Sequence, residues 1–416
     1  MVPRVKGTQD FLDLSLYNFV IERAKKQLQL YHFTEIATPI LEAVELFNRS
    51  LGLYTEVVTK EMFVITTTGE EEAICLRPEG TASTVRAFIE HQIQPPWKVF
   101  SYGPMFRYER PQKGRYRQFH QINMEIIGTE AIEQDVQLIK MLDRFFHEEL
   151  SLNSYALLIN FLGCFDDRKT YQLLLKDFLE GPIEGELCSM CLDRKERNIM
   201  RIFDCKNPLC QKIYKNAPTI VDNLCKPCAK EWQQLQDELS LLSISYAYQP
   251  TLVRGLDYYN KTVFEFVSKN LGAQNTFCGG GRYDQLVGQL GAKEDHPSLG
   301  AAIGIERLLL LLEPFKDQLP LASLPALHVI MPITSSQYSL ALLLADELQA
   351  QNLCIDILLA GDSVKSMMRK ANKMGAAYAL ILGEEEQKTR TVSIKNMTTG
   401  KEEQVLQIEA AQFVKK

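Results

Sequence analysis

The segment at residues 100–128 carries a group of cations next to a strand-like run. Its basic side chains fall within eleven residues and are Arg107, Arg110, Lys113, Arg115 and Arg117. Gly114 among them gives the backbone the freedom that a loop between two strands needs. Because guanidinium groups bind phosphate oxygens through charge-assisted hydrogen bonds, a loop of this composition suits a polyphosphate or an RNA end.

The run that follows this loop, residues 119–127, alternates between apolar and polar side chains, which predicts a strand with two different faces. The apolar face carries Ile122, Met124 and Ile126. The polar face carries Gln121, Asn123 and Glu125. The apolar face predicts contact with a core. The polar face is either a ligand-binding platform or an ordinary solvent-exposed surface, and the strand alone leaves both interpretations open.

A further cation, Arg307, lies in a predicted helix that is apolar on nearly every side. The small residues at 300–304 before it allow another backbone segment to approach closely. A buried guanidinium group needs an anionic partner. That partner is either an internal carboxylate, Glu306 or Glu79, or the phosphate of a ligand.

Two more segments combine charge with polar or aromatic groups. Arg254 precedes Tyr258 and Tyr259 at the start of a predicted strand, and Glu79 and Thr81 lie in a Pro/Gly turn that leads into a helix. Each segment also has a purely structural interpretation. The first is then a charged turn with packed aromatic rings, and Glu79 is a favourable charge in the first turn of a helix.

The surrounding pattern predicts the elements that position these residues. Helical periodicity occurs at residues 14–28 and 134–150. Short β-branched or aromatic runs at 62–67, 97–102 and 251–267 predict antiparallel strands. Beyond residue 322, strands alternate with helices, which predicts a mainly parallel sheet. We therefore expect an α+β domain with an antiparallel sheet over residues 1–322, interrupted by an insertion at about 181–245, and a small α/β domain over residues 323–416.

Composition excludes several classes of function. The chain has 416 residues, of which 46% are hydrophobic, and a formal net charge of -6, so it should not attract nucleic acid non-specifically. Neither a GxxxxGK[ST] loop nor a GxGxxG turn occurs. No apolar run approaches the roughly 20 residues of a membrane span, and no secretory leader is recognisable. These features predict a cytoplasmic protein without a membrane partner.

Six of the ten cysteines fall within 41 residues. They include two CxxC pairs, Cys188 with Cys191 and Cys225 with Cys228, which are separated by 33 residues. In a reducing compartment this pattern favours zinc over disulfides, although the gap is wider than the usual spacing of about 15–20 residues. A structural zinc site in the insertion and a set of free thiols are the two alternatives.

Together these segments resemble the class II aminoacyl-tRNA synthetases, and specifically the histidyl-tRNA synthetase family, over nearly the whole chain. FRYERPQKGRYRQFHQ resembles the second class II motif and GIERLLLL the third, whereas LVRGLDYYNKTVFEF and CGGGRYDQL resemble the two signatures specific to the histidine enzymes. The opening KGTQDF and the domain order also fit. The resemblance implies a cytoplasmic homodimer that ligates L-histidine to tRNA(His) through a histidyl-adenylate, using ATP with Mg2+.

The same resemblance implies a role for each matching residue. Arg107 and Arg254 are implied to contact the α-phosphate of ATP from two sides, and Arg307 to hold the γ-phosphate. Phe119 is implied to stack on adenine, and Arg115 to face ATP and the tRNA acceptor end. The residues implied to bind histidine are Glu79, Gly80, Thr81, Gln121, Glu125, Tyr258 and Tyr259, with Glu125 and Tyr259 bracketing the imidazole.

Residues 323–416 resemble the anticodon-binding domain that the histidine, threonine, proline and glycine enzymes share. Four basic side chains on one predicted helix are either an RNA contact or a solvated surface: Lys365, Arg369, Lys370 and Lys373. Two rival interpretations remain. Another class II synthetase should lack RGLDYY, and a synthetase-like regulatory subunit of ATP phosphoribosyltransferase, which binds histidine without charging tRNA, typically lacks this C-terminal domain.

Overall fold

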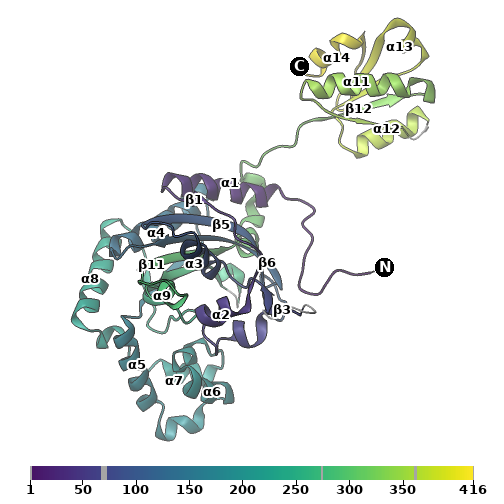
Figure 1. Ribbon diagram of the computed structural model, residues 1–416. Helices are drawn as coiled ribbons and strands as arrows, with labels where there is room; N and C mark the ends of the chain where they lie inside the picture. The colour runs from purple at the N-terminus through teal and green to yellow at the C-terminus, as the bar shows by residue number, and fades with distance from the viewer. Residues whose placement is uncertain (1, 67–72, 273–274, 360–362, 416) are drawn as a thin grey trace. The chain divides into compact units, whose positions relative to one another are not determined.

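The computed structural model describes residues 2–66, 73–272, 275–359 and 363–415. The chain divides into two compact units, Met1–Leu321 and Ala322–Lys416 (Figure 1). The sequence predicts a domain boundary after residue 322. Among the helices of the described ranges, none combines the length and the apolar composition that crossing a bilayer requires.

The first unit is built on an eight-stranded sheet with the strand order β1-β5-β6-β11-β10-β9-β7-β8. Neighbouring strands are antiparallel except at the two edges, where β1 runs parallel to β5 and β8 parallel to β7. The predicted antiparallel sheet is therefore confirmed. In spatial order the strands are β1 (Thr34–Glu35), β5 (Trp97–Phe106), β6 (Gln118–Ile127), β11 (Ser298–Gly304), β10 (Thr276–Arg282), β9 (Asn260–Val267), β7 (Ala156–Phe161) and β8 (Ala247–Tyr248).

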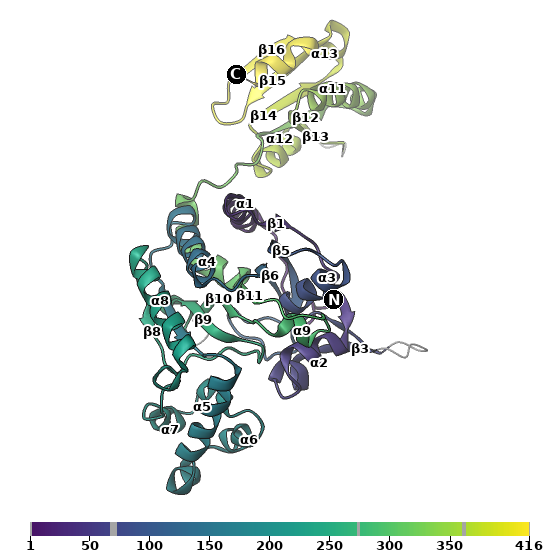
Figure 2. The same cartoon turned by 60° about the vertical axis from the view of Figure 1, so that its left-hand side comes forward.

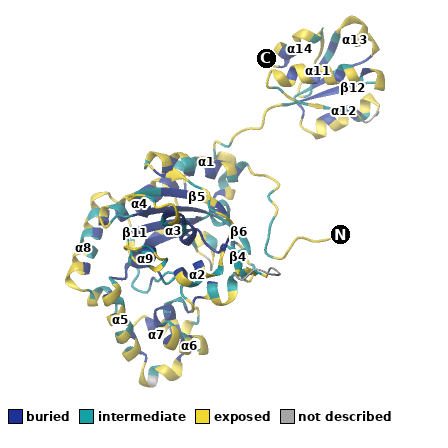
Figure 3. Cartoon of the chain, in the orientation of Figure 1, coloured by how far each residue is buried: buried dark blue, intermediate teal, exposed yellow. Residues whose placement is uncertain are grey.

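Helices cover both faces of this sheet, and the strands between them are the most buried part of the unit (Figures 2 and 3). On one face the core includes Ile122, Met124 and Ile126, so the predicted apolar side of β6 is confirmed. The helices packed there are α1 (Ser15–Leu30), α4 (Ile132–Arg144), α8 (Lys226–Leu241) and α10 (Ile305–Leu312). The helices on the other face are α2 (Val44–Leu51), α3 (Thr81–Glu90), α5 (Phe165–Phe178) and α9 (Leu286–Gln289).

A small sheet of three strands lies at the edge of this second face, in the order β2-β4-β3. Its strands are β2 (Leu41–Ala43), β4 (Ile74–Leu76) and β3 (Phe63–Ile65). The sequence predicts a strand over residues 62–67, whose last residue lies outside the described ranges. The sheet matters for the site because β4 leads directly into the turn before α3.

The segment between α5 and α8 consists of short helices. They are η3 (Gly181–Glu186), α6 (Ser189–Arg197), η4 (Ile199–Asp204), α7 (Pro208–Tyr214) and η5 (Val221–Asn223). The helix α8 falls within the predicted insertion range, yet its Leu235 and Leu239 belong to the main core. The compact part of the insertion therefore ends before α8, whose apolar stripe docks it onto the sheet.

The second unit has a five-stranded sheet with the order β13-β12-β14-β15-β16. The strands β13 (Cys354–Ile357), β12 (Leu327–Pro332) and β14 (Tyr378–Leu382) are parallel, but β15 (Thr391–Asn396) and β16 (Glu402–Leu406) add an antiparallel hairpin. The predicted mainly parallel sheet is thus correct only for the first three strands. The helices α11 (Tyr338–Ala350) and α14 (Ala410–Val414) pack against one face, and α12 (Val364–Lys373) against the other.

A buried ion pair joins β10 to the first turn of α4. Arg282 is fully buried, and its Nη2 lies 2.6 Å from Oδ2 of Asp135, which is 1% exposed. The guanidinium group also donates to the carbonyl oxygens of Thr129 and Ala131, at 2.8 Å each. With a further contact of 3.4 Å from Nη1 to Oδ1 of Asp284, both ends of the guanidinium group have partners, so this arginine of the GGGRYD segment serves the fold.

Replacing Asp135 with alanine should lower the free energy of unfolding by about 3–5 kcal/mol, because it removes the nearer carboxylate of a buried guanidinium group and leaves it only the longer contact with Asp284. Chemical denaturation of the purified chain measures this change. The matched control is Glu148→Ala, which removes the partner of Arg144 in an exposed pair on the same helical segment and should cost less than about 1 kcal/mol. Equal effects of the two substitutions would contradict the role given to the Asp135–Arg282 pair.

Candidate active site

Three arginines from distant parts of the chain line one cavity of about 420 Å³ in the first unit. Arg107 follows the end of β5, Arg254 lies in the loop before β9, and Arg307 lies in α10. The cavity therefore gathers three cations over the polar face of the sheet. Guanidinium groups gathered in this way can each bind phosphate oxygens of a ligand.

Arg107 is fixed at the base of the loop that joins β5 to β6. Its Nε donates to the carbonyl oxygen of Pro78 at 2.9 Å, and its guanidinium carbon lies 5.5 Å from the centre of the Phe119 ring. Within the same loop, Arg115 forms ion pairs with Glu109 and, at 3.7 Å, with Glu61. These contacts hold the cations of the loop against the cavity in defined positions.

Arg254 reaches the cavity from the loop that leads into β9. It forms an ion pair with Glu265, and its guanidinium carbon lies 5.6 Å from the centre of the Tyr259 ring. A Cβ atom at Gly279 would lie only 2.5 Å from Nη1 of Arg254, so glycine at this position of β10 leaves room for the guanidinium group. The Nε atom of Arg254 is buried and has no partner among the described residues.

Arg307 is not paired with the internal carboxylates that the sequence suggested as partners. It donates to the carbonyl oxygens of Gly114 and Thr276. Glu306 instead accepts from the backbone amide of His120 at 2.9 Å and contacts its ring nitrogen Nδ1 at 2.8 Å. The carbonyl groups orient the Arg307 side chain, and neither Glu306 nor Glu79 forms an ion pair with it.

Glu79 both caps a helix and lines the cavity. Its carboxylate accepts from the backbone amides of Thr81 and Ala82, at 2.7 and 2.8 Å, and so caps the first turn of α3. It also lines the cavity, and burial raises its pKa. The turn around Gly80 therefore presents a carboxylate and a hydroxyl group to a ligand from one helix terminus.

Glu125 lies behind Thr81, on the polar face of β6, and is 1% exposed. It accepts hydrogen bonds from Oγ1 of Thr81 at 2.7 Å and from the hydroxyl group of Tyr283. Burial raises the pKa of Glu125 to about 8, against the opposing effect of these two hydrogen bonds. A Cβ atom at Gly300 would lie 1.7 Å from its Oε2, so only glycine leaves space for the carboxyl group.

The polar face of β6 also presents amide groups without partners. Oε1 of Gln121 and Nδ2 of Asn123 are both buried, and neither has a hydrogen-bond partner among the described residues. Both residues line the cavity. Because buried polar groups are nearly always hydrogen-bonded, these two amides indicate a polar ligand in the cavity.

The two adjacent tyrosines complete this end of the cavity. Tyr258 and Tyr259 both line it, with ring centres 4.5 Å apart, and Tyr258 lies 5.6 Å from the ring of Tyr283. Burial is the main cause that raises the pKa of Tyr258 and of Tyr259. Two of these rings thus line the cavity, and the third, Tyr283, packs against Tyr258.

Several residues that line the cavity were not predicted from the sequence. Four of them come from the insertion: Arg194, Arg201, Asp204 and Lys206. Nη1 of Arg201 donates to the carbonyl oxygen of Arg254 at 3.3 Å. No motif marks these residues, because their role depends on how the insertion packs. Tyr283 lies in CGGGRYDQL and Glu265 in LVRGLDYYNKTVFEF, so both could have been identified from these two signatures.

The two CxxC pairs of the sequence belong to different clusters. Cys188 and Cys191 lie with Cys205 and Cys210, whereas Cys225 and Cys228 lie with Cys164 and Asp167. A single site built from both CxxC pairs, the arrangement suggested by their spacing, is therefore wrong. The first pair lies at the start of α6 and the second at the start of α8.

The chain is similar to known proteins over nearly its whole length. A family model for histidyl-tRNA synthetase matches residues 17–308, and one for an anticodon binding domain matches residues 328–416. The histidine–tRNA ligase of Nitratidesulfovibrio vulgaris is 42% identical over 409 residues, covering 97% of this chain and 96% of that protein. The histidine–tRNA ligase of Aquifex aeolicus is 40% identical over 409 residues, covering 97% and 98%.

The chain is also similar to solved structures. The crystal structure of apo S. aureus histidyl-tRNA synthetase matches with a TM-score of 0.80 at 32% identity and covers 100% of both chains. A Bacillus halodurans protein described as an ATP phosphoribosyltransferase regulatory subunit/histidyl-tRNA synthetase has a TM-score of 0.62 at 19% identity, covers 89% of this chain and 96% of its own, and shares the fold. By its motifs, its fold and its relatives over nearly the full length, the chain belongs to the histidyl-tRNA synthetase family of class II aminoacyl-tRNA synthetases.

Proposed function

We propose that the chain ligates L-histidine to tRNA(His) in two steps, through a histidyl-adenylate. In the first step a carboxylate oxygen of histidine attacks the α-phosphorus of ATP, and pyrophosphate leaves. In the second, a hydroxyl group of the 3'-terminal ribose of the tRNA attacks the acyl carbon, and AMP leaves. The observation that carries this proposal is the convergence of Arg107, Arg254 and Arg307 on one cavity that Glu79, Thr81, Gln121, Tyr258 and Tyr259 also line.

Arg107 and Arg254 supply the electrostatic part of the first step. Negative charge builds up on the oxygens around the α-phosphorus as the new bond forms. Both guanidinium groups are held in advance, Arg107 by the Pro78 carbonyl and Arg254 by Glu265 and the space at Gly279. Preorganised cations of this kind lower a barrier by several kcal/mol, since they need no reorientation during the reaction.

The rest of the nucleotide would occupy the remainder of the cavity. We assign Arg307 to the γ-phosphate, Phe119 to stacking on adenine, and Arg115 to the nucleotide and the acceptor end of the tRNA. The triphosphate would bring Mg2+ with it, which neutralises part of its charge. The lining carboxylates Glu109 and Glu265 offer the oxygen ligands that this cation prefers.

Histidine would be held at both ends. We assign Glu79, Gly80, Thr81 and Gln121 to its backbone groups, because a carboxylate beside an ammonium group gives a charge-assisted hydrogen bond. We assign Glu125, Tyr258 and Tyr259 to the imidazole. A substrate without ring nitrogens would leave these buried polar groups unpaired, and this penalty supplies selectivity without editing.

The second unit would recognise the anticodon end of the tRNA. All four basic side chains of α12, at positions 365, 369, 370 and 373, are exposed, while Met367 and Ala371 of the same helix are buried. The helix therefore turns its charged side outward, where it can follow an RNA backbone. We accordingly assign catalysis to residues 1–322 and tRNA recognition to residues 323–416, acting in the cytoplasm.

The regulatory-subunit alternative is less well supported. Such a protein binds histidine without charging tRNA, so it needs neither the anticodon-binding domain nor the cationic loop around Arg107. This chain has the domain, and its loop directs Arg107 and Arg115 to the cavity. The relatives that match at about 40% identity over nearly full length are ligases.

The direct test of this function is amino-acid-dependent exchange between ATP and pyrophosphate, screened with each of the twenty amino acids. We expect exchange with histidine alone. We also expect Arg254→Ala to slow this exchange by about 10²–10³-fold, the effect typical of removing one donor to a developing charge. Exchange driven only by another amino acid, or none at all with an intact fold, would refute the proposal.

The control for Arg254→Ala is Arg144→Ala, which removes an exposed cation of α4. We expect this variant to keep normal exchange. Histidine binding, measured by calorimetry, should be largely retained in Arg254→Ala, because Arg254 is assigned to the phosphate and not to the amino acid. Near-normal exchange in Arg254→Ala would refute the role of this arginine.

The raised pKa of Glu125 predicts a pH dependence of stability. Between the ordinary carboxyl value of 4.5 and the folded value of about 8, the folded chain holds a proton that the unfolded chain releases. This contribution is fully present below about pH 4.5 and is lost as pH rises towards 8, with a slope of up to about 1.4 kcal/mol per pH unit. Glu125→Gln should lack it, and should also bind histidine more weakly.

Urea denaturation at several pH values between 5 and 8 measures this effect as the difference between the unmodified chain and the variant. The matched control is Glu294→Gln, which changes an exposed carboxylate and should leave the pH profile unaltered. If the difference between the unmodified chain and Glu125→Gln stays constant over this range, the carboxyl group of Glu125 does not carry the proton assigned to it.

We further propose a homodimer. Large apolar side chains are exposed in the N-terminal part of the first unit, and they include Leu12, Leu14, Leu41, Leu53 and Tyr54. A second copy that covers them would remove apolar surface from water. Light scattering at micromolar concentration should give about twice the chain mass of 47.5 kDa, and a monomer under these conditions would contradict the proposal.

A further inference from the structure

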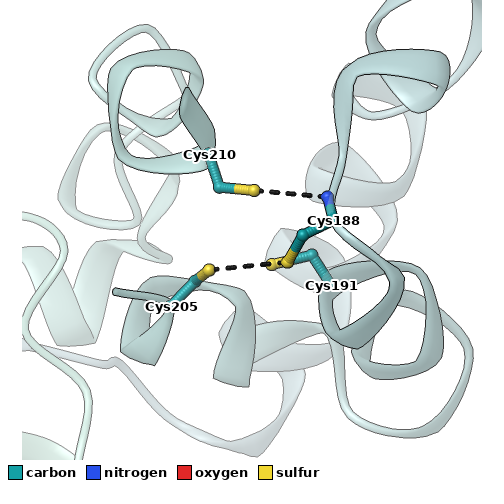
Figure 4. A group of neighbouring side chains, drawn as sticks. All are labelled: Cys188, Cys191, Cys205 and Cys210. Carbon is teal, nitrogen blue, oxygen red and sulfur yellow. Dashed lines mark hydrogen bonds between the residues drawn. The ribbon is translucent and has the colours of Figure 1, made fainter. Parts of the chain in front are cut away.

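The insertion contains a compact cluster of four thiols, Cys188, Cys191, Cys205 and Cys210 (Figure 4). Their Sγ atoms all lie within 4.8 Å of one another, and those of Cys188 and Cys205 are 3.8 Å apart. With zinc–sulfur bonds of about 2.3 Å in a tetrahedron, two ligating sulfurs lie about 3.8 Å apart. The cluster thus already has the dimensions of a closed tetrathiolate site.

The surroundings of these sulfurs also suit thiolate ligands. The backbone amide of Cys188 donates to Sγ of Cys210, and that of Asn207 donates to Sγ of Cys205, both at 3.4 Å (Figure 4 shows the first). Hydrogen bonds of this kind orient metal ligands and stabilise their charge. Cys191, Cys205 and Cys210 are buried, so the site is closed to solvent on most sides.

We propose that these four cysteines bind one Zn2+ ion as a structural site. Thiolate ligands select zinc among the common divalent cations, and four protein ligands leave no open coordination position for catalysis. The ligands come from three short elements, since Cys188 and Cys191 begin α6, Cys205 follows η4 and Cys210 lies in α7. Short helices gain stability from such a link.

The zinc ion would also support one wall of the cavity. Cys205 lies between Asp204 and Lys206, which both line the cavity, and η4 carries Arg201, which donates to the carbonyl oxygen of Arg254. The metal would therefore fix the insertion against the loop that holds Arg254. Its binding does not depend on which reaction the cavity performs.

A second cluster independently supports a second zinc site. The ligand atoms of Cys164, Asp167, Cys225 and Cys228 also lie within 4.8 Å of one another. Asp167 already faces this space, because its Oδ1 accepts from the amide of Cys225 at 2.9 Å and its Oδ2 lies 3.4 Å from Sγ of Cys225. We infer that three thiolates and one carboxylate bind Zn2+ here and join the start of α5 to the start of α8.

Elemental analysis of the full-length chain, purified without chelators in zinc-containing buffer, tests both sites. We expect about two equivalents of zinc per chain, one for each closed set of four ligands. Cys191→Ser should lose about one equivalent, and Cys225→Ser should lose about one from the other cluster. Cys354→Ser, a change at an exposed cysteine of the second unit, is the matched control and should keep both.

Each site stands or falls separately. Full zinc content in Cys191→Ser overturns the first site, and full content in Cys225→Ser overturns the second. If a serine variant fails to fold, the unmodified chain expressed with cobalt in place of zinc gives the decision. Thiolate-to-cobalt charge-transfer absorption supports the sites, and a cobalt-loaded chain without it overturns both.

Discussion

Several arginines share a partly buried cavity, and their like charges repel one another. The active site therefore depends on the groups that compensate this repulsion. Guanidinium groups of like charge come together only where other groups compensate them. Within the chain, Glu265 balances Arg254 and Glu109 balances Arg115, whereas Arg307 contacts carbonyl oxygens alone. The lining as a whole carries seven basic side chains and seven carboxylates, so the proposed triphosphate would be bound by the position of the guanidinium groups and not by an excess of positive charge.

The sheet admits these side chains because glycine stands opposite them. Gly279 in β10 leaves the space for the guanidinium group of Arg254, and Gly300 in β11 the space for the carboxyl group of Glu125. Gly280 has another cause, since a Cβ atom there would lie 2.2 Å from the carbonyl oxygen of Gly300 on the neighbouring strand. The glycine-rich strands therefore combine close strand pairing with room for charged groups.

The insertion takes part in the site although it lies outside the catalytic sheet. Its residues line the cavity and contact the backbone at Arg254, and it consists of short helices whose buried side chains belong to the same core cluster as Tyr258 and Tyr259. The two proposed zinc sites, one inside the insertion and one where it joins α5 and α8, would hold these short helices together. The precision of the cavity thus rests partly on links far from the sheet.

The family, the antiparallel sheet and the two faces of β6 could be predicted from the sequence, because motifs and the two-residue period of a strand are local properties of the chain. Which groups meet became known from the folded arrangement. It gave Arg307 carbonyl partners, joined Tyr283 to Glu125, and assigned the two CxxC pairs to separate clusters. Contacts between residues far apart in the chain depend on strand register and loop closure, which no local pattern encodes.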